Sequence, residues 1–456
     1  MKTPVYDFAT EYVNSKAVRL HMPGHKGKSL LGCEAGDITE ISGADALYEA
    51  SGIIGESEAN ATALFGTGRT VFSTEGSSQC VRAMLELARR WWQKQHDKAE
   101  ERPVIVAARN VHKAFLYAAI LLDFDVVWLW PEEENPSLCS CVITTKTLET
   151  VLAEQGNKVA AVYLTSPNYL GGMADISAIA ECAHRHNTLL LVDNAHGAYL
   201  HFLENSLHPM DFGADICCDS AHKTLPVLTG GAYLHISKNA PCELQSWAKG
   251  AMELFGSTSP SYLILQSLDL CNRYLAEEFR EKLKETCELL AICKKHLRQN
   301  GWQIEETDPL RITIKVSGGL NGYELAEHLR KNQIECEFAD GDYLVLMATP
   351  DNSVQDFERL LTALRKISSP CDVTNEPKKI PMAVCVKQAM TMREAYFSEG
   401  DTIPVTEARG RICRLPSATC PPAIPVVVPG EIIDEAAMKC FLYYGIETVE
   451  VVKWQK

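Results

Sequence analysis

The chain has 456 residues, 46% of them hydrophobic and 23% charged, and a formal net charge of −15 at pH 7. This length predicts two or three domains, and the composition is typical of a globular protein. The acidic balance and the lack of basic runs argue against a nucleic acid or an anionic membrane as partner. We expect a cytoplasmic protein with reduced thiols, because there is no signal peptide, no 18-residue apolar stretch and no Cys-x-x-Cys pair among the 17 cysteines.

Short apolar segments alternate with helical patterns over the first three-quarters of the chain. The expected strands are 103–107, 125–130, 159–164, 188–193, 215–219 and 231–236, and the expected helices between several of them are 77–95, 112–122 and 176–186. Strands that alternate with crossover helices predict an α/β fold with a mainly parallel sheet covered on both faces. Ligands of such sheets bind at the C-terminal ends of the strands.

The rest of the chain predicts smaller domains. Residues 260–299 have the apolar spacing of one long or kinked helix, which leads into an α+β segment at 301–366. Its expected strands are 312–316 and 343–347, and its expected helices are 322–331 and 355–366. Residues 368–377 have the composition of a linker, and the last segment, 383–456, contains strand-like runs at 424–428 and 448–452.

Two of the expected strand ends carry charged side chains. One strand ends at Asp193, and another is followed by Ser220, His222 and Lys223. A lysine at a strand end often pairs with a nearby acid, which is the simpler interpretation. A carboxylate and an amine at two strand ends also suit pyridoxal phosphate, because the amine forms a Schiff base with its aldehyde and the carboxylate keeps its pyridine nitrogen protonated.

Two further motifs lie where a strand turns into a helix. Gly76 permits a tight turn, and Ser77 and Ser78 place hydroxyl groups beside the first free N–H groups of the next helix. This combination predicts a phosphate site, although a plain serine cap has the same pattern. His112 begins another helix, where its ring could stack on the pyridine ring or simply cap the helix.

His21 and His25 are spaced as in a zinc-binding helix. Pro23 and Gly24 lie between them and forbid a regular helix. No carboxylate stands where such a zinc site needs its general base. We therefore expect a rigid loop that lines a pocket, and no metal site.

Several segments together resemble the bacterial ornithine/lysine/arginine decarboxylase family, which has the aspartate-aminotransferase-like fold of pyridoxal-phosphate enzymes. The segments are 21–27, 37–40, 110–113, 193–197, 220–226, 257–262, 421–425 and 429–431. The resemblance implies a large domain with a mainly parallel sheet between helices, followed by smaller α+β C-terminal domains. The expected domains are an N-terminal arm and pocket loop at 1–30, a large cofactor-binding domain at 31–260, a long helix with a small α+β domain at 261–367, and a C-terminal decarboxylase-type domain at 378–456.

The resemblance also implies roles for individual residues. Lys223 would form the Schiff base, Asp193 would pair with the pyridine nitrogen, and His112 would stack on the ring. The expected catalytic residues are Lys223, His222, Asp193 and His112. The expected cofactor contacts are Gly76, Ser77, Ser78, His112, Asp193, Ala195, His196, Ser220, His222, Lys223, Ser257 and Thr258. Of these, Ser257 or Thr258 would reach the phosphate of a neighbouring subunit. The expected substrate contacts are Glu431 and His25, and either His222 or Lys223 would return a proton to Cα.

Two departures from the family qualify the comparison. The large acid-stress enzymes of the family carry an N-terminal wing domain, whereas the first motif here begins at residue 21. We therefore expect a short form without that domain. Glu75 also precedes Gly76 where the family usually has a neutral residue, and this places an extra carboxylate near the phosphate. We expect the Glu75 side chain to turn away from the phosphate.

The expected activity is pyridoxal-phosphate-dependent decarboxylation of a basic amino acid to its amine, a polyamine precursor. Arginine and lysine stand ahead of ornithine as substrates. We expect a homodimer or higher homo-oligomer with its sites at the dimer interface. An aminotransferase or a β-lyase on the same fold is the alternative, in which Arg409, Arg411 or Arg414 would hold the substrate carboxylate. A third possibility is a non-enzymatic protein that binds a partner or senses the cofactor.

Overall fold

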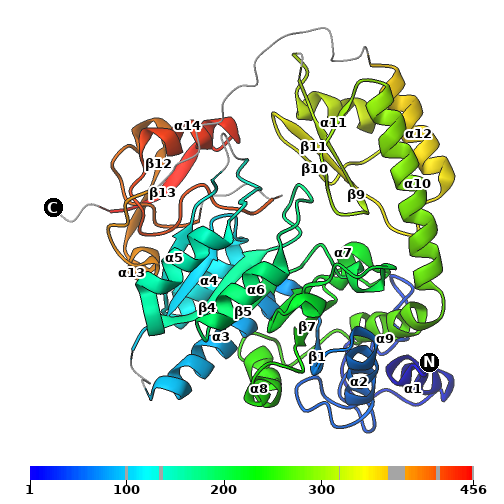
Figure 1. Ribbon diagram of the computed structural model, residues 1–456. Coiled ribbons are helices and arrows are strands. Elements are labelled where there is room, and N and C mark those ends of the chain that lie inside the picture. The colour runs from blue at the N-terminus through cyan, green and yellow to red at the C-terminus, as the bar shows by residue number, and fades with distance from the viewer. Residues whose placement is uncertain (98–100, 133–136, 318, 368–385, 417–421, 454–456) are drawn as a thin grey trace. The chain divides into compact units, whose positions relative to one another are not determined.

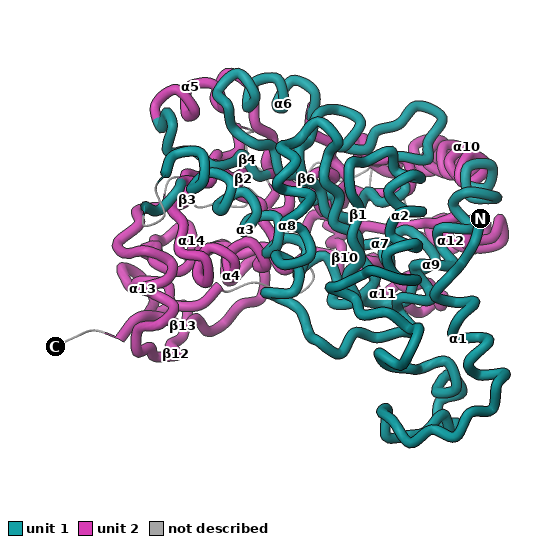
Figure 2. The backbone as a smooth tube through the Cα atoms, turned by 90° about the horizontal axis from the view of Figure 1, so that it is seen from below, with its two compact units in different colours: residues 1–103, 155–163, 176–282 teal, residues 104–154, 164–175, 283–456 magenta. Residues whose placement is uncertain are grey.

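The computed structural model describes residues 1–97, 101–132, 137–317, 319–367, 386–416 and 422–453 (Figure 1). They form two compact units, shown in different colours in Figure 2. Unit 1 comprises residues 1–103, 155–163 and 176–282, and unit 2 comprises residues 104–154, 164–175 and 283–456. The linker expected at 368–377 lies outside the described residues. The domain boundaries expected from the sequence stay a prediction.

The main sheet has seven strands in the order β1-β7-β6-β5-β4-β2-β3. The strands are β1 (Arg69–Ser73), β2 (Val104–Ala108), β3 (Asp125–Leu129), β4 (Val159–Thr165), β5 (Leu189–Asp193), β6 (Ile216–Asp219) and β7 (Ala232–Ile236). β5 pairs in parallel with β6, and β2 with β3, whereas β7 runs antiparallel to both β6 and β1. The predicted α/β fold is confirmed, and six strands lie within one residue of their predicted bounds. β1 was not predicted.

The helices of unit 1 pack against its strands. Its helices are α1 (Pro4–Asn14), α2 (Ile53–Phe65), α3 (Ser77–His96), α6 (Ile176–Arg185), α7 (Ala221–Thr224), α8 (Cys242–Glu253) and α9 (Tyr262–Glu277), with 3-10 turns η1 (Gly156–Lys158), η2 (Leu200–Phe202) and η3 (Pro209–Phe212). α3 buries Cys80, Met84, Leu87 and Ala88, whose three- and four-residue spacing makes one apolar face. That face packs on β5, β6 and β7, while α6 packs on β5. These contacts support the strand ends that carry Asp193 and Asp219.

Unit 2 contains the remaining helices and two smaller sheets. Its helices are α4 (Lys113–Leu122), α5 (Thr145–Gln155), α10 (Phe279–Gln299), which starts in unit 1, α11 (Gly322–Lys331), α12 (Val354–Arg365), α13 (Met392–Phe397) and α14 (Glu435–Tyr443), with the 3-10 turn η5 (Val405–Glu407). A four-stranded antiparallel sheet has the order β10 (Phe338–Ala339), β11 (Tyr343–Met347), β9 (Arg311–Lys315) and β8 (Gln303–Ile304). β12 (Gly400–Pro404) pairs antiparallel with β13 (Thr448–Val452).

Two predictions in the later part of the chain concern residues 260–299 and 424–428. The helix predicted at 260–299 is present as two helices, α9 and α10, which are separated at Glu278. The strand predicted at 424–428 is wrong, because this run has irregular backbone within the apolar core of unit 2. Pro425 has no N–H group to donate to a strand ladder. The apolar side chains of this run are therefore buried in the core without forming a strand.

The described residues also bear on the cysteines and on membranes. All 14 cysteines among them are free thiols. No helix in the described part of the chain is long and apolar enough to cross a membrane.

Candidate active site

Lys223 lies on α7, the single helical turn that follows β6. Its backbone N–H donates to the carbonyl of Ser220 (3.0 Å), and its Nζ lies 3.0 Å from Nε2 of His196. The neighbouring His222 is held by its ring Nδ1, which lies 2.9 Å from the carbonyl oxygen of Gly231 and donates to it. The turn therefore holds the amine in a half-buried position beside an imidazole ring.

Asp193 ends β5 and is buried. Its Oδ1 accepts a hydrogen bond from the backbone N–H of Ala195 (3.1 Å), and its Oδ2 accepts one from the hydroxyl of Tyr163 (3.2 Å). Burial raises the pKa of Asp193, while the charge of Lys223 and these donors lower it. The structure thus brings together the acid and the amine that the sequence predicted at two strand ends.

The predicted phosphate motif opens α3. Gly76 has a φ of +74°, and a Cβ at this position would meet no atom within 4 Å. Ser77 and Ser78 are the first two residues of the helix, and the Ser220 hydroxyl donates to the Ser77 hydroxyl (2.7 Å). Free N–H groups and hydroxyl groups at the start of a 20-residue helix form a suitable place for a phosphate. The structure therefore joins two of the expected phosphate contacts across 143 residues of sequence.

Glu75 has a specific partner next to this motif. Its Oε1 accepts a hydrogen bond from the backbone N–H of Ser257 (2.5 Å), whose own hydroxyl accepts from the N–H of Ser259 (3.1 Å). Ser257 and Thr258 are exposed in this chain. The extra carboxylate therefore supports the 257–259 segment, which the family resemblance assigned to the phosphate of a neighbouring subunit.

His112 and Glu431 lie in unit 2. His112 is the N-cap of α4, where its Nδ1 accepts a hydrogen bond from the N–H of Ala114 (3.1 Å). Glu431 is 2% exposed and pairs with Arg109 through its Oε2 (3.0 Å), which also accepts from the N–H of Val428 (2.8 Å). Burial raises the pKa of Glu431, and Arg109 lowers it.

Sequence reasoning missed the role of Arg109. Its guanidinium lies 4.9 Å from the ring of Trp128 and 5.2 Å from that of Trp130, and it donates to the carbonyl of Val426 (3.2 Å). A guanidinium that is 97% buried needs a carboxylate, and Glu431 supplies it inside the protein. The one available signal was an arginine directly after the apolar strand β2, which by itself names no partner.

The loop at 21–27 has no helix, as predicted. His25 Nδ1 accepts from the N–H of Gly27 (2.9 Å), and its Nε2 lies 3.2 Å from Oδ2 of Asp37. His21 Nε2 is 2.6 Å from the hydroxyl of Tyr12. Both rings therefore have partners within the N-terminal part of unit 1.

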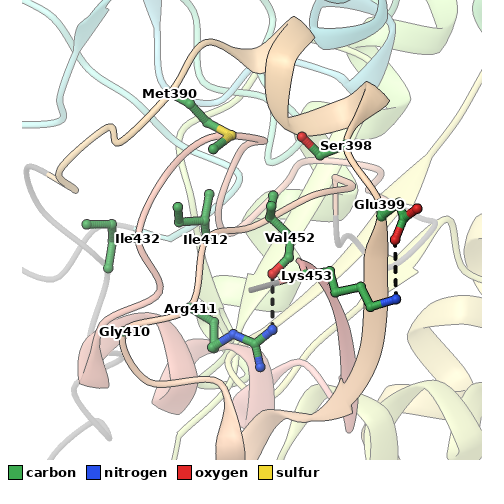
Figure 3. A pocket seen from close by; sticks show the side chains of 9 residues that line it. All are labelled: Met390, Ser398, Glu399, Gly410, Arg411, Ile412, Ile432, Val452 and Lys453. Carbon is green, nitrogen blue, oxygen red and sulfur yellow. Dashed lines mark hydrogen bonds and ion pairs between the residues drawn. The ribbon is translucent and has the colours of Figure 1, made fainter. Parts of the chain in front are cut away.

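Arg409, Arg411 and Arg414, which would hold the substrate carboxylate in an aminotransferase or β-lyase, contact other residues of the C-terminal segment. Arg409 lies 4.0 Å from Glu435, and Arg414 donates to the carbonyl of Ser398 (2.8 Å). Arg411 donates to the carbonyl of Val452 (3.0 Å) at a cavity of about 720 Å³, where Lys453 also pairs with Glu399 (Figure 3). The cavity is lined by Met390, Ser398, Glu399, Gly410, Arg411, Ile412, Ile432, Val452 and Lys453. None of the residues expected at the decarboxylase site lines it.

Comparison with known proteins identifies the family. The model of the Orn/Lys/Arg decarboxylase major domain matches residues 3–317, and that of the family's C-terminal domain matches residues 374–449. The chain belongs to the Orn/Lys/Arg decarboxylase family. It is a pyridoxal-phosphate-dependent enzyme that decarboxylates a basic amino acid.

Individual members of the family match most of the chain. The chain is 30% identical to arginine decarboxylase of Bacillus subtilis (strain 168), with 95% of this chain and 92% of the relative covered. It is 27% identical to arginine decarboxylase of Bacillus anthracis, with 95% and 91% covered. The solved structure of the Francisella novicida lysine decarboxylase LdcF shares the fold, with a TM-score of 0.80, 17% identity, and coverage of 99% of this chain and 81% of that chain.

The side chains of unit 1 fit this cofactor. An amine, a buried carboxylate and a pair of hydroxyl groups at a helix N-terminus are the three kinds of group that its aldehyde, pyridine nitrogen and phosphate require. When bound, pyridoxal phosphate accepts the electron pair that carbon dioxide leaves behind. The protein contributes the attachment, the orientation and the charges around the cofactor.

Proposed function

We propose that this enzyme decarboxylates arginine or lysine, ahead of ornithine, and releases the corresponding amine as a polyamine precursor. The observation that carries the proposal is the placement of Lys223 beside His196 and near the buried Asp193, in a chain of this family. Arginine stands first, because relatives at 27–30% identity over most of the chain are arginine decarboxylases.

The roles proposed for residues of unit 1 follow from their positions. Lys223 holds the cofactor through Nζ, and Asp193 keeps the pyridine nitrogen protonated in a buried setting. Ser77 and Ser220 hold the phosphate at the Gly76 turn. The remaining proposed cofactor contacts are Ser78, Ala195, His196, His222, and Ser257 or Thr258 toward a neighbouring subunit. Stacking by His112, and substrate contacts by Glu431 and His25, also stay proposals.

We assign the return of a proton to Cα to Lys223 rather than to His222. His222 donates from Nδ1 to the carbonyl of Gly231. Burial lowers the pKa of His222, so the neutral ring has no proton on Nε2 to give. The Nζ of Lys223 carries protons that it can transfer.

The proposed assembly is a cytoplasmic homodimer or higher homo-oligomer with its sites at the interface. Support comes from Ser257 and Thr258, which are exposed here and belong to the segment that the family resemblance directs to a second subunit. Mixing two inactive variants, Lys223→Ala and Ser257→Tyr, tests this. Shared sites would restore part of the activity in mixed dimers, whereas self-contained sites would leave the mixture inactive.

The activity is tested with purified protein and added pyridoxal phosphate. Arginine, lysine and ornithine are offered in parallel, and evolved carbon dioxide and the amine product are measured, with Lys223→Ala as the control. Release of agmatine, cadaverine or putrescine by the wild type alone supports the proposal and names the substrate. Cofactor binding without carbon dioxide from any of the three amino acids would overturn it.

A further inference from the structure

A fully buried carboxylate lies directly before the Lys223 turn. Asp219 ends β6, and its Oδ2 lies 3.0 Å from Nε2 of His208 and 3.1 Å from Nε2 of His235. Asp219, His208 and His235 are each 0% exposed. Its Oδ1 accepts a hydrogen bond from Nδ2 of Asn194 (2.7 Å). Nothing in the catalytic roles proposed above uses this group.

The second ring nitrogens show what the two histidines do. His208 Nδ1 accepts a hydrogen bond from the N–H of Met210 (3.3 Å), so in the neutral ring the proton is on Nε2, which donates to Asp219. His235 Nδ1 lies 2.9 Å from the hydroxyl of Thr70. Burial raises the pKa of Asp219, but the two histidines outweigh it and hold the pKa below its usual range.

The same arrangement argues against a metal ion. His208, Cys217 and Asp219 have ligand atoms within 4.8 Å of one another, which is a possible donor set for zinc. A metal ligand needs the lone pair of Nε2, and in His208 that nitrogen carries the proton, because Nδ1 accepts from Met210. Asp219 is therefore a hydrogen-bonded anion, with donors from Asn194 directly after β5, His235 on β7 and His208 at the N-cap of η3.

The contact with Asn194 leads to the cofactor site. Asn194 follows Asp193, and its backbone N–H donates to the carbonyl of Cys218 on β6 (3.0 Å). Its side chain is tightly packed, because a Cβ on Gly197 would fall 1.9 Å from its Oδ1. Through this contact Asp219 holds the end of β5 and the turn after it, which carry Asp193 and His196. Asp219 also lies directly before the turn that carries Lys223.

We propose that Asp219 is a positioning residue that ties the two strand ends of the active site together. Through Asn194 it sets the place of Asp193 and His196, and through the backbone it sets the place of Lys223. Because the acid and the amine must reach two different ends of one cofactor, their separation matters. This inference rests on the proposed function, in which Asp193 and Lys223 hold the cofactor.

Three variants test the inference. Asp219→Asn keeps the shape and removes the anion. Asn194→Ala keeps the His208–Asp219–His235 group and removes only its link to the turn after β5, so it serves if Asp219→Asn does not fold. Asp269→Asn is the matched control, because Asp269 is also a fully buried carboxylate of unit 1, which accepts from Ser57 Oγ (2.5 Å), Val5 N (2.9 Å) and Tyr6 N (3.0 Å).

The measurements are the visible absorbance of the bound cofactor, its Kd, and kcat and KM with the preferred amino acid. We expect Asp219→Asn and Asn194→Ala to shift the absorbance band, weaken cofactor binding, and lower kcat about 100-fold with little change in KM, since a misplacement of about 1 Å has this effect. Asp269→Asn should lower the melting temperature without any of these changes.

Wild-type absorbance and kcat in Asn194→Ala, or equal effects from Asp269→Asn, would overturn the inference. Failure of the proposed function is seen separately, because it shows in the wild type. If the wild type binds the cofactor but releases no amine, the absorbance and Kd of the variants still report whether Asp219 positions the site.

Discussion

Lys223 Nζ lies 3.0 Å from Nε2 of His196, a residue that follows Asp193 by three positions. The end of β5 therefore supplies the buried carboxylate, and the turn after it supplies the partner of the amine that comes from the turn after β6. In a parallel pair such as β5 and β6, both turns lie at the same edge of the sheet. This relationship explains why one cofactor can reach both groups.

Replacing Lys223 by alanine should abolish amine release. The substitution removes the proposed covalent attachment of the cofactor and the proposed proton donor to Cα, and loss of proton transfer alone lowers rates about 10²- to 10⁴-fold. The measurement is amine product from the purified variant, with circular dichroism to show that it folds. Lys238→Ala, which removes an exposed lysine of the same unit, is the control and should keep full activity. Activity of Lys223→Ala within tenfold of the wild type would contradict the assignment.

Replacing Asp193 by asparagine should lower kcat by about 10²- to 10³-fold, as removal of a preorganised electrostatic group does elsewhere. The amide keeps an oxygen for the N–H of Ala195 but loses the charge that the pyridine nitrogen needs. Asp193→Glu keeps the charge and should recover part of the rate. If the asparagine and glutamate variants were equally active, charge at this position would not be what the reaction requires.

The fold could be predicted from sequence wherever the signal was local. The strands β2 to β7 could be predicted because each is a short apolar run. α11 was predicted with the bounds that it has, and the structure shows a capping box of Asn321 and Glu324 at its start. β1 was missed because Arg69 and Thr70 break its apolar pattern, and it is held in place by antiparallel pairing with β7, whose paired residues lie 159 to 167 positions further along the chain. Long-range pairing of this kind has no local signature.

The candidate site also has residues that the local sequence predicts and others that only long-range packing brings together. Asp193, Lys223 and Ser77 could be predicted because each stands at the end of a strand or the start of a helix, where polar side chains gather. The partner of Glu431 could not, because Arg109 is 322 positions away and only packing brings the two together. His208 and His235 were missed as partners of Asp219 for the same reason, since neither histidine carries a local sign of an acceptor.

Glu75→Gln should leave cofactor affinity nearly unchanged, since the structure directs this side chain to the N–H of Ser257. An amide oxygen can still accept that hydrogen bond. The charge is exposed, so its effect on a nearby phosphate is worth about 1 kcal/mol or less, or about fivefold in Kd. Cofactor titration followed by absorbance checks this. A change of affinity much larger than fivefold in Glu75→Gln would mean that the carboxylate does not turn away from the phosphate.

The buried ion pair of Arg109 and Glu431 should make a large contribution to the free energy of unfolding. Arg109→Met leaves the carboxylate unpaired and should cost about 3–5 kcal/mol of unfolding free energy. The double variant Arg109→Met/Glu431→Gln should recover most of this loss, because neither charge is then stranded. Urea unfolding of the wild type, both single variants and the double variant measures the coupling directly. Additive losses would show that the two side chains do not act as a pair. If Glu431 also binds substrate, Glu431→Gln should raise KM as well.

The free energy of unfolding should fall as the pH rises past neutrality, in part because of His184. Its Nε2 donates to Oδ2 of Asp215 (2.9 Å), and this hydrogen bond raises the pKa of His184 above its ordinary value of 6.5. A raised pKa in the folded state means that the stabilisation is fully present below the unfolded value and is lost as the pH rises through the folded one. His184→Gln should therefore flatten the pH dependence between about pH 6 and 8. The side chain is 46% exposed, so added salt should weaken the effect.

His296→Gln, which removes an exposed histidine of α10 and leaves the Asp215 contact intact, is the control and should keep the wild-type slope. Urea midpoints measured across this pH range for the three proteins decide the matter, and an unchanged slope in His184→Gln would show that the contact with Asp215 contributes nothing to it.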